Sequence, residues 1–402
     1  MPLSIAIAIG NFVGWLSRIS GRGSGVMVTG RTILALQPRA ASLLAQRKEI
    51  VLISGTNGKT TTTALISRVL SEKSEVATNY TGANLFAGVV AGLATVAKAP
   101  RAVLEVDELV LPWAIKELSP SLIALLNLGR DQLDRLSEVR IVAAKWKSAL
   151  KDLPANCTVI ADSDDPFVTW AVRDCKKITW FSSGVSSHLD AATCPECGEL
   201  LTWSSNTYSC NCGFAKPIAE WILVDQELRH DGKSVNVKSA IPGRAALGNA
   251  ARAIIAGAHF GISAESALKS ISTISQVDGR FNEVKISGAS LRLMLAKNPA
   301  SWSETLETSS RKNVILSVNA NTQDGKDTSW LWDVDYLPLQ GRQIGVTGDR
   351  VLDISARLTS QGISHTRFDS VSTAAQSFSG TEVDLIASYT AFHALVKSAV
   401  KK

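Results

Sequence analysis

Short apolar runs alternate along much of the chain with stretches in which apolar residues recur at helical spacing. Residues 49–53 form one such run, a Gly-rich turn follows, and residues 60–70 have the spacing of a helix. Further strand-like runs at 102–106 and 122–126 are separated by helix-like stretches such as 85–97. Because parallel strands need helical crossovers, this alternation predicts an α/β fold with a doubly wound parallel sheet.

The pattern changes in the middle of the chain. A strand-like run at 157–161 leads into a polar loop at 162–166, and a helix should begin at Phe167. Residues 182–217 then lose the alternation, which indicates an insertion rather than another strand and helix.

The alternation of predicted strands and helices returns after the insertion. Helices are predicted at 247–260 and 264–271, and a turn at 276–280 separates them from a last segment with its own strands. Those strands are predicted at 290–295, 314–318, 343–346 and 383–387. We therefore expect a helical segment at 1–45, a central domain at 46–285 with an insertion at about 185–220, and a C-terminal α/β domain at 286–402.

Composition adds little to this division. The chain has 402 residues, 45% of them apolar, with a formal charge of +6 and no long Lys/Arg block. The first nineteen residues are rich in apolar side chains, but no Lys or Arg precedes Arg18, and Asn11 and Gly14 interrupt the run. This pattern fits neither a secretory signal nor a membrane span, so we predict a buried or interfacial helix, with contact to a membrane surface left open.

The turn after the first predicted strand has the composition of a nucleotide-phosphate loop. Such a loop needs glycines that let backbone N–H groups turn inward, a Lys that reaches the phosphates and a hydroxyl for Mg²⁺. Gly55, Gly58, Lys59 and Thr60 supply these, although Ile53 stands where the generic pattern has its first Gly. The strand before it and the helix after it support the assignment.

The insertion contains two pairs of cysteines, each followed by Gly. Their spacing predicts a structural Zn²⁺ site with four thiolate ligands, Cys194, Cys197, Cys210 and Cys212. Cys157 and Cys175 are interpreted as core residues, and the compartment as the reducing cytoplasm. A zinc ribbon beside Trp203 and Tyr208 also allows a nucleic-acid-binding protein, but the acidic motifs and the last domain would then have no role, so no nucleic acid is expected.

The phosphate loop, Gly-Thr-Asn-Gly-Lys-Thr-Thr-Thr, resembles that of Mur ligases and folylpolyglutamate synthases. The resemblance spans nearly the whole chain and is closest to the MurT subunits of lipid II isoglutaminyl synthases. The motifs that carry it occur in the expected order at 81–85, 101–108, 127–135, 164–166, 279–281, 293–300 and 327–335.

The resemblance implies a Mur-ligase-like central domain with a zinc-ribbon insertion and a Rossmann-like C-terminal domain. ATP phosphates would lie on the loop, with Asn249 on the adenine side and Arg280 also meeting the nucleotide. Mg²⁺ would be held by Thr60 and Glu105, with Glu108 as the second choice of carboxylate. The loop residues assigned to ATP are Gly55, Thr56, Asn57, Gly58, Lys59, Thr60 and Thr61.

The implied reaction is ATP-dependent amidation of the D-isoglutamate α-carboxyl in lipid II, at the inner face of the membrane. No cysteine has the setting of a glutaminase nucleophile, so ammonia would come from a partner glutaminase, GatD, in a heterodimer. Asp333, or alternatively Asp335, would orient the catalytic His of that partner, beside the aromatic residues Trp330, Trp332 and Tyr336.

Two other reactions remain open at this point. An amino-acid-adding Mur ligase would normally have a His where Gln132 stands, and a folylpolyglutamate synthase would bind a pteridine. Gln132 and the four cysteines argue against both.

Overall fold

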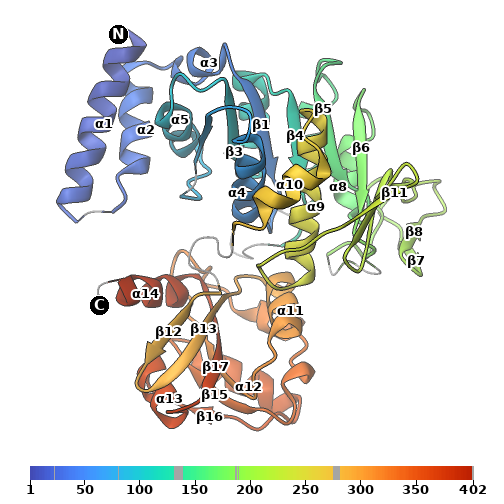
Figure 1. The fold of residues 1–402 in the computed structure, drawn as a ribbon. Helices are drawn as coiled ribbons and strands as arrows, with labels where there is room; N and C mark the ends of the chain where they lie inside the picture. Colours follow the sequence, from blue (N-terminus) through green and yellow to red (C-terminus); the bar gives the residue numbers. More distant parts are fainter. Residues whose placement is uncertain are drawn as a thin grey trace. The chain divides into compact units, whose positions relative to one another are not determined.

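The computed structural model describes residues 1–21, 23–79, 81–130, 139–185, 188, 190–274 and 281–400, with the side chains of 398–400 excepted. The chain forms two compact units (Figure 1). The first unit comprises Met1–Leu128, Ser137–Ala240 and Ala246–Ser275. The second comprises Gly129–Leu136, Ile241–Ala245 and Gln276–Lys402.

The first unit is built on a nine-stranded sheet in the order β11-β10-β9-β6-β5-β4-β1-β3-β2. The strands β2, β3, β1, β4, β5, β6 and β9 run parallel to one another. At the other edge, β9, β10 and β11 form an antiparallel meander. The predicted parallel sheet is thus confirmed. The strands are β1 (Glu49–Ser54), β2 (Val76–Thr78), β3 (Arg101–Glu105), β4 (Leu122–Leu125), β5 (Thr158–Asp162), β6 (Ile178–Ser182), β9 (Trp221–Val224), β10 (Glu227–His230) and β11 (Lys233–Asn236).

Two hydrophobic cores cover the two faces of this sheet. Ile50 and Leu52 of β1 enter one core and Val51 and Ile53 the other, because successive strand residues point to opposite faces. Helices α4 (Lys59–Leu70), α9 (Arg244–His259) and α10 (Ala264–Ile271) cover the second face. The first is covered by α3 (Ala40–Ala45), α5 (Phe86–Thr95), α6 (Leu111–Leu118), α7 (Val139–Leu150) and α8 (Pro166–Val172).

The helices α1 (Leu3–Ile19) and α2 (Val26–Leu36) form a hairpin beside α5 (Figure 1). Glycines allow its close packing: a Cβ on Gly14 would lie 1.9 Å from Thr29 Oγ1, and one on Gly30 would lie 1.7 Å from the carbonyl oxygen of Ala87. In the described part of the chain, no helix is both long and apolar enough to cross a membrane.

The cysteine insertion leaves the sheet after β6 and returns at β9. It contains the hairpin of β7 (Thr202–Ser204) and β8 (Thr207–Ser209) and a small core that includes Tyr208. The Tyr208 hydroxyl donates to the carbonyl oxygen of Ser163 at 3.1 Å and lies 2.8 Å from the Thr169 hydroxyl. Tyr208 is therefore part of the small core of the insertion and also bonds the insertion to the main body of the first unit.

The second unit has a six-stranded sheet in the order β12-β13-β17-β14-β15-β16, parallel except for the β12–β13 hairpin. Its strands are β12 (Glu283–Ile286), β13 (Ala289–Leu295), β14 (Asn313–Ser317), β15 (Gln343–Thr347), β16 (Thr366–Arg367) and β17 (Glu382–Ala387). Its helices are α11 (Pro299–Thr308), α12 (Val351–Ser360), α13 (Val371–Ser377) and α14 (Tyr389–Val400), with 3-10 turns η1 (Ser329–Asp333) and η2 (Leu337–Leu339).

Candidate functional site

The phosphate loop connects β1 to the N-terminus of α4. Gly55 and Gly58 have φ of 140° and 86°, which other residues adopt only with strain. Neither position has room for a side chain, since a Cβ on Gly55 would lie 2.9 Å from the backbone of Asn127 and one on Gly58 would lie 2.9 Å from Asn249 Oδ1. The loop therefore presents backbone N–H groups at a helix N-terminus, the arrangement that binds phosphate.

Asn127 holds this loop in place. Its Oδ1 accepts a hydrogen bond from the Asn57 N–H at 2.9 Å, and its Nδ2 donates to the Asn57 carbonyl at 3.1 Å. The Thr56 N–H also donates to the carbonyl of Asn127, at 2.8 Å. In the sequence, Asn127 is visible only as the first residue of the motif at 127–135, because its role depends on the pairing of β1 with β4.

Lys59 is folded back onto the loop and is only 7% exposed. Its ammonium donates to the carbonyls of Gly55 and Thr56, at 2.5 and 3.2 Å, and to Glu108 Oε1 at 3.1 Å. Glu108, the second choice after Glu105 for the Mg²⁺ carboxylate, is the ion-pair partner of Lys59. A buried ammonium needs such a carboxylate to offset its lost hydration.

Glu105 ends β3 and is 3% exposed. Asn84 donates to its Oε1 at 3.0 Å, and Asn79 fixes its backbone through bonds of 2.8 and 2.7 Å. Its Oε2 and the Thr60 hydroxyl both lie within 4 Å of the point that a Cβ on Gly82 would occupy. A carboxylate and a hydroxyl therefore flank one small space beside the phosphate loop, a donor set that suits Mg²⁺.

Asn249, on α9, is buried with its amide beside Gly58. Thr61 is buried in the first turn of α4. Arg280, Gln132 and the rest of the segment 131–135 lie outside the described residues, so their predicted roles are not tested by the geometry.

The acidic loop after β5 links the phosphate-loop region to the insertion. Asp165 caps α8 through its Oδ1, while its Oδ2 accepts from the Leu128 N–H at 2.6 Å and lies 3.2 Å from His188 Nε2. Burial lowers the pKa of His188, but the charge and hydrogen bond of Asp165 outweigh it and raise that pKa above its usual value. Asp165 thus joins His188 of the insertion to the backbone of Leu128. Leu128 directly follows Asn127, the residue that holds the phosphate loop.

Asp164 anchors the base of the insertion from the same acidic loop. It binds Lys216 at 2.6 Å, Ser182 at 2.6 Å and the Ser183 N–H at 2.8 Å. Burial raises the pKa of Asp164, but the hydrogen bonds from Lys216 and Ser182 hold it below its usual value.

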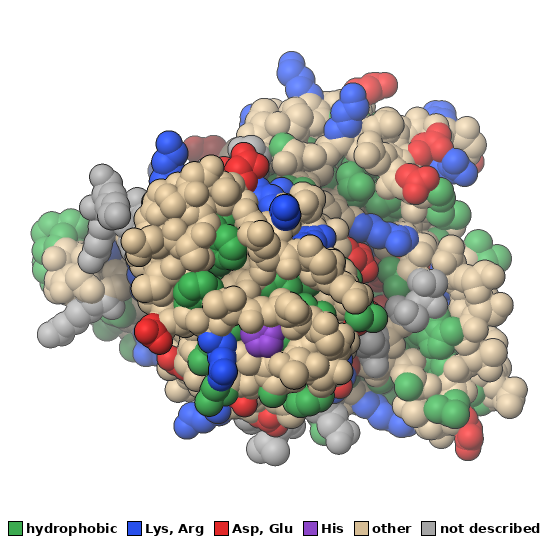
Figure 2. All heavy atoms as spheres, turned by 90° about the horizontal axis from the view of Figure 1, so that it is seen from below, with side chains coloured by type: hydrophobic (Ala, Val, Ile, Leu, Met, Phe, Trp, Pro, Cys, Tyr) green, Lys and Arg blue, Asp and Glu red, His purple; other side chains and the backbone are tan. Residues whose placement is uncertain are grey.

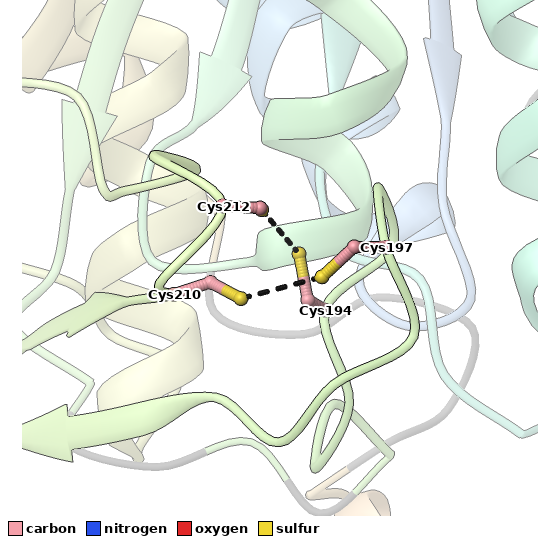
Figure 3. Close-up of side chains that lie close together, drawn as sticks. All are labelled: Cys194, Cys197, Cys210 and Cys212. Atoms are coloured by element: carbon pink, nitrogen blue, oxygen red, sulfur yellow. Dashed lines mark hydrogen bonds between the residues drawn. The ribbon is translucent and has the colours of Figure 1, made fainter.

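The four predicted ligands of the insertion converge (Figure 3). The Cys194 and Cys212 sulfurs are 3.7 Å apart, those of Cys197 and Cys210 are 3.4 Å apart, and all four lie within 4.8 Å of one another. Sulfurs bound tetrahedrally at 2.3 Å from Zn²⁺ would be about 3.8 Å apart. The arrangement therefore fits a single tetrahedral ion.

In the second unit, the two candidate aspartates differ in environment. Asp333 ends η1 with a side chain 40% exposed and forms an ion pair with Arg130 at 3.0 Å. Asp335 accepts from the N–H of Leu337, the first residue of η2, and from Gln361 Nε2, both at 3.0 Å.

The prediction that three aromatic residues beside Asp333 could contact a partner is corrected by the structure. Trp332 is 54% exposed, but Trp330 and Tyr336 are buried in the core of the second unit. A 3-10 turn points neighbouring side chains in different directions, so sequence proximity to Asp333 was a poor guide to exposure. Of the three, only Trp332 is exposed enough to contact a partner.

Comparisons with known proteins agree with this architecture. The model of the Mur ligase middle domain matches residues 53–257, and that of the MurT ligase C-terminal domain matches 295–392. The protein named lipid II isoglutaminyl synthase (glutamine-hydrolyzing) subunit MurT is 29% identical in Staphylococcus aureus strain COL, over 79% of this chain and 78% of that one. Its counterpart of the same name from Streptococcus pneumoniae strain R6 is 29% identical over 86% and 84%.

Solved structures show the same fold at low identity. A pseudomurein peptide ligase type C from Methanothermus fervidus matches with a TM-score of 0.66 and 19% identity, over 88% of this chain and 79% of that one. The MurF ligase of Thermotoga maritima in complex with ADP matches with a TM-score of 0.66 and 17% identity, over 90% and 83%. The chain belongs to the Mur ligase superfamily and has the C-terminal domain of the MurT ligases.

Proposed function

We propose that this chain is the synthetase subunit of a lipid II isoglutaminyl synthase, which amidates the α-carboxyl of D-isoglutamate in the stem peptide with ATP and ammonia. The observation that carries the proposal is the combination of a Mur ligase nucleotide domain and a MurT C-terminal domain in one chain, with relatives of that name aligned over most of its length.

The loop at residues 55–61 would hold ATP through backbone N–H groups at the N-terminus of α4, with the Lys59 ammonium turned from Glu108 to the terminal phosphates. Thr60 and Glu105 would hold Mg²⁺, which supplies charge neutralisation for the phosphates when bound. Asn249 and Arg280 are proposed to meet the rest of the nucleotide.

The chemistry takes two steps. An oxygen of the substrate carboxylate attacks the γ-phosphorus and ADP leaves, which gives an acyl phosphate. Ammonia then attacks the carbonyl carbon, phosphate leaves and a proton is lost, which gives the amide. The first step brings two anions together, and the positive end of α4 and Lys59 offset their repulsion.

The source of ammonia is proposed to be a separate glutaminase, GatD. Glutamine hydrolysis of this kind needs a thiolate nucleophile. Burial raises the pKa of Cys157 to about 12 and that of Cys175 to about 11, so both are protonated at neutral pH. The other four cysteines converge on one point and are proposed to hold a structural Zn²⁺.

Asp333 is proposed to orient the catalytic His of that glutaminase. Its exposure beside Trp332 supports this choice over Asp335, whose carboxylate already has two hydrogen-bond donors from its own unit. Arg130 would exchange its ion pair with Asp333 for another contact when the partner binds.

Nucleic acid is not a proposed ligand. Acidic and basic side chains are interspersed on the face drawn in Figure 2, whereas a nucleic-acid site would be expected to gather Lys and Arg.

The proposed reaction is tested by finding which nitrogen compound, ammonium or an amino acid, the chain needs for ADP release. The purified chain is incubated with ATP, Mg²⁺ and lipid II, and ADP is measured with ammonium or with single amino acids. ADP release that depends on both lipid II and ammonium supports the proposal. Release that depends on an amino acid would assign the chain to the amino-acid-adding ligases instead.

A further inference from the structure

One face of α1 is almost wholly apolar and exposed. At about 100° per residue, the spacing places its large apolar side chains on one side of the helix. We call these residues the α1 outer face: Ile5, Ile9, Phe12, Trp15, Leu16 and Ile19, each 37–63% exposed.

The outer face is a surface and not the edge of a core. The opposite side of α1, with Ala6, Gly10 and Gly14, packs against α2, and α2 in turn packs against α5. The Phe12 and Trp15 rings stack at 5.8 Å within the outer face. Hydrophobic side chains also gather at the left margin of Figure 2, the side on which Figure 1 shows α1. A continuous apolar row of this length is unusual on a protein that meets only water.

The charge of the chain is concentrated in the same segment. Residues 1–48 contain six Lys or Arg and no Asp or Glu. The whole chain contains 42 Lys and Arg and 36 Asp and Glu, so the residues after 48 carry 36 of each. The entire net charge of +6 therefore lies in the segment that presents the outer face, where Arg18 and Arg31 are exposed on the two helices of the hairpin.

We propose that the α1 outer face docks onto a lipid bilayer whose surface carries anionic headgroups. Apolar side chains with Trp among them, flanked by Arg, are the features of a helix that lies in a membrane interface. The basic segment favours anionic lipid, because each cation near such a surface gains attraction. A second copy of the chain is a poorer occupant, since it would bring two positively charged segments together. The proposal does not depend on the amidation reaction.

The test uses the full chain and vesicles that contain no lipid II. Sedimentation should recover the protein with vesicles of phosphatidylglycerol and phosphatidylcholine but not with phosphatidylcholine alone, and salt should weaken the binding. The double variant Phe12→Glu, Ile19→Glu should bind anionic vesicles about tenfold less or weaker still, because it places charges in the apolar layer. These side chains are 57% and 63% exposed, so the fold should persist.

Leu352→Glu is the matched control, an equally exposed apolar residue on α12 of the second unit that should leave binding unchanged. Circular dichroism and nucleotide binding check that each variant is folded. Three results would overturn the proposal: no binding of the original chain to anionic vesicles, equal binding to both vesicle types, or binding that the double variant retains. If the original chain forms a dimer and binds no vesicles, and the double variant is monomeric, the outer face would be assigned to self-association.

Discussion

The side chain of Asn127 and the backbone of Asn57 form two reciprocal hydrogen bonds, of 2.9 and 3.1 Å, across the base of the phosphate loop. Because Asn127 follows β4, the strand next to β1, the sheet holds the loop in addition to the bonds that Lys59 makes within it. The shape that receives phosphate is therefore set before a nucleotide arrives.

Replacing Asn127 should weaken nucleotide binding more than it weakens the fold. Asn127→Ala removes both bonds to Asn57, and we expect ADP affinity to fall about tenfold, the effect of roughly 1.4 kcal/mol. Titration calorimetry with ADP measures this change. Asn156→Ala, at an exposed position before β5, is the control, and an unchanged affinity for Asn127→Ala would show that the loop does not need this anchor.

The two acidic residues beside the phosphate loop, Glu105 and Glu108, should have separable effects. Glu105→Gln should raise the Mg²⁺ concentration needed for half-maximal ADP release and lower the maximal rate about 100-fold, because a charged oxygen ligand becomes a neutral one. Glu108→Gln should leave the Mg²⁺ dependence near that of the original chain, since Glu108 binds Lys59. The reverse ranking in a Mg²⁺ titration would exchange the two roles.

The His188–Asp165 pair should make stability depend on pH. The folded-state pKa of His188 is raised by Asp165, so its stabilising contribution is complete below the unfolded value of 6.5 and is lost as pH rises through the folded value. The free energy of unfolding, measured by denaturant titration from pH 6 upward, should therefore decrease more in the original chain than in His188→Gln. Parallel curves for the two proteins would contradict this coupling.

The purified chain should contain one Zn²⁺. Cys194→Ser should abolish the metal content measured by mass spectrometry and lower the unfolding temperature, because four-thiolate sites contribute directly to folding. Cys175→Ser, which alters a cysteine outside the cluster, should keep the metal. Full zinc loss with an unchanged unfolding temperature would remove the structural role.

Asp333 should matter for glutamine but not for ammonium. With the partner glutaminase present, Asp333→Asn should lower glutamine-dependent amidation about 100-fold or more, because the partner His loses the group that holds it. Ammonium-dependent amidation should stay within about twofold, since no step of synthesis uses Asp333. Asp335→Asn should affect mainly stability, because Asp335 accepts hydrogen bonds from Leu337 and Gln361 of its own unit. Equal losses of Asp333→Asn with both nitrogen sources would contradict the assignment.

Features set by local sequence were the ones that could be predicted. Apolar runs located β1, β3 and β4, and the turn chemistry of Gly55 and Gly58 located the phosphate loop between β1 and α4. The spacing of the four cysteines predicted a shared metal site, and their sulfurs do converge on one point.

Features that depend on contacts between distant segments could not be predicted. No sequence pattern near His188 indicates its contact with Asp165. Likewise, no pattern near Asn127 indicates its hydrogen bonds with Asn57. The predicted helix in residues 1–19 could not be divided into a packed and an exposed face without knowing that α2 covers Gly10 and Gly14.

The central claim, that this chain joins ammonia to a lipid-linked carboxylate, is tested most directly by the product. The chain is incubated with lipid II, ATP, Mg²⁺ and isotopically labelled ammonium, with Lys59→Ala as the inactive control, and the product is fragmented in a mass spectrometer. We predict labelled amide nitrogen on the α-carboxyl of the D-isoglutamyl residue, with one ADP per amide and none formed by Lys59→Ala. Lipid II recovered without label, or label on another carboxyl group, would contradict the account.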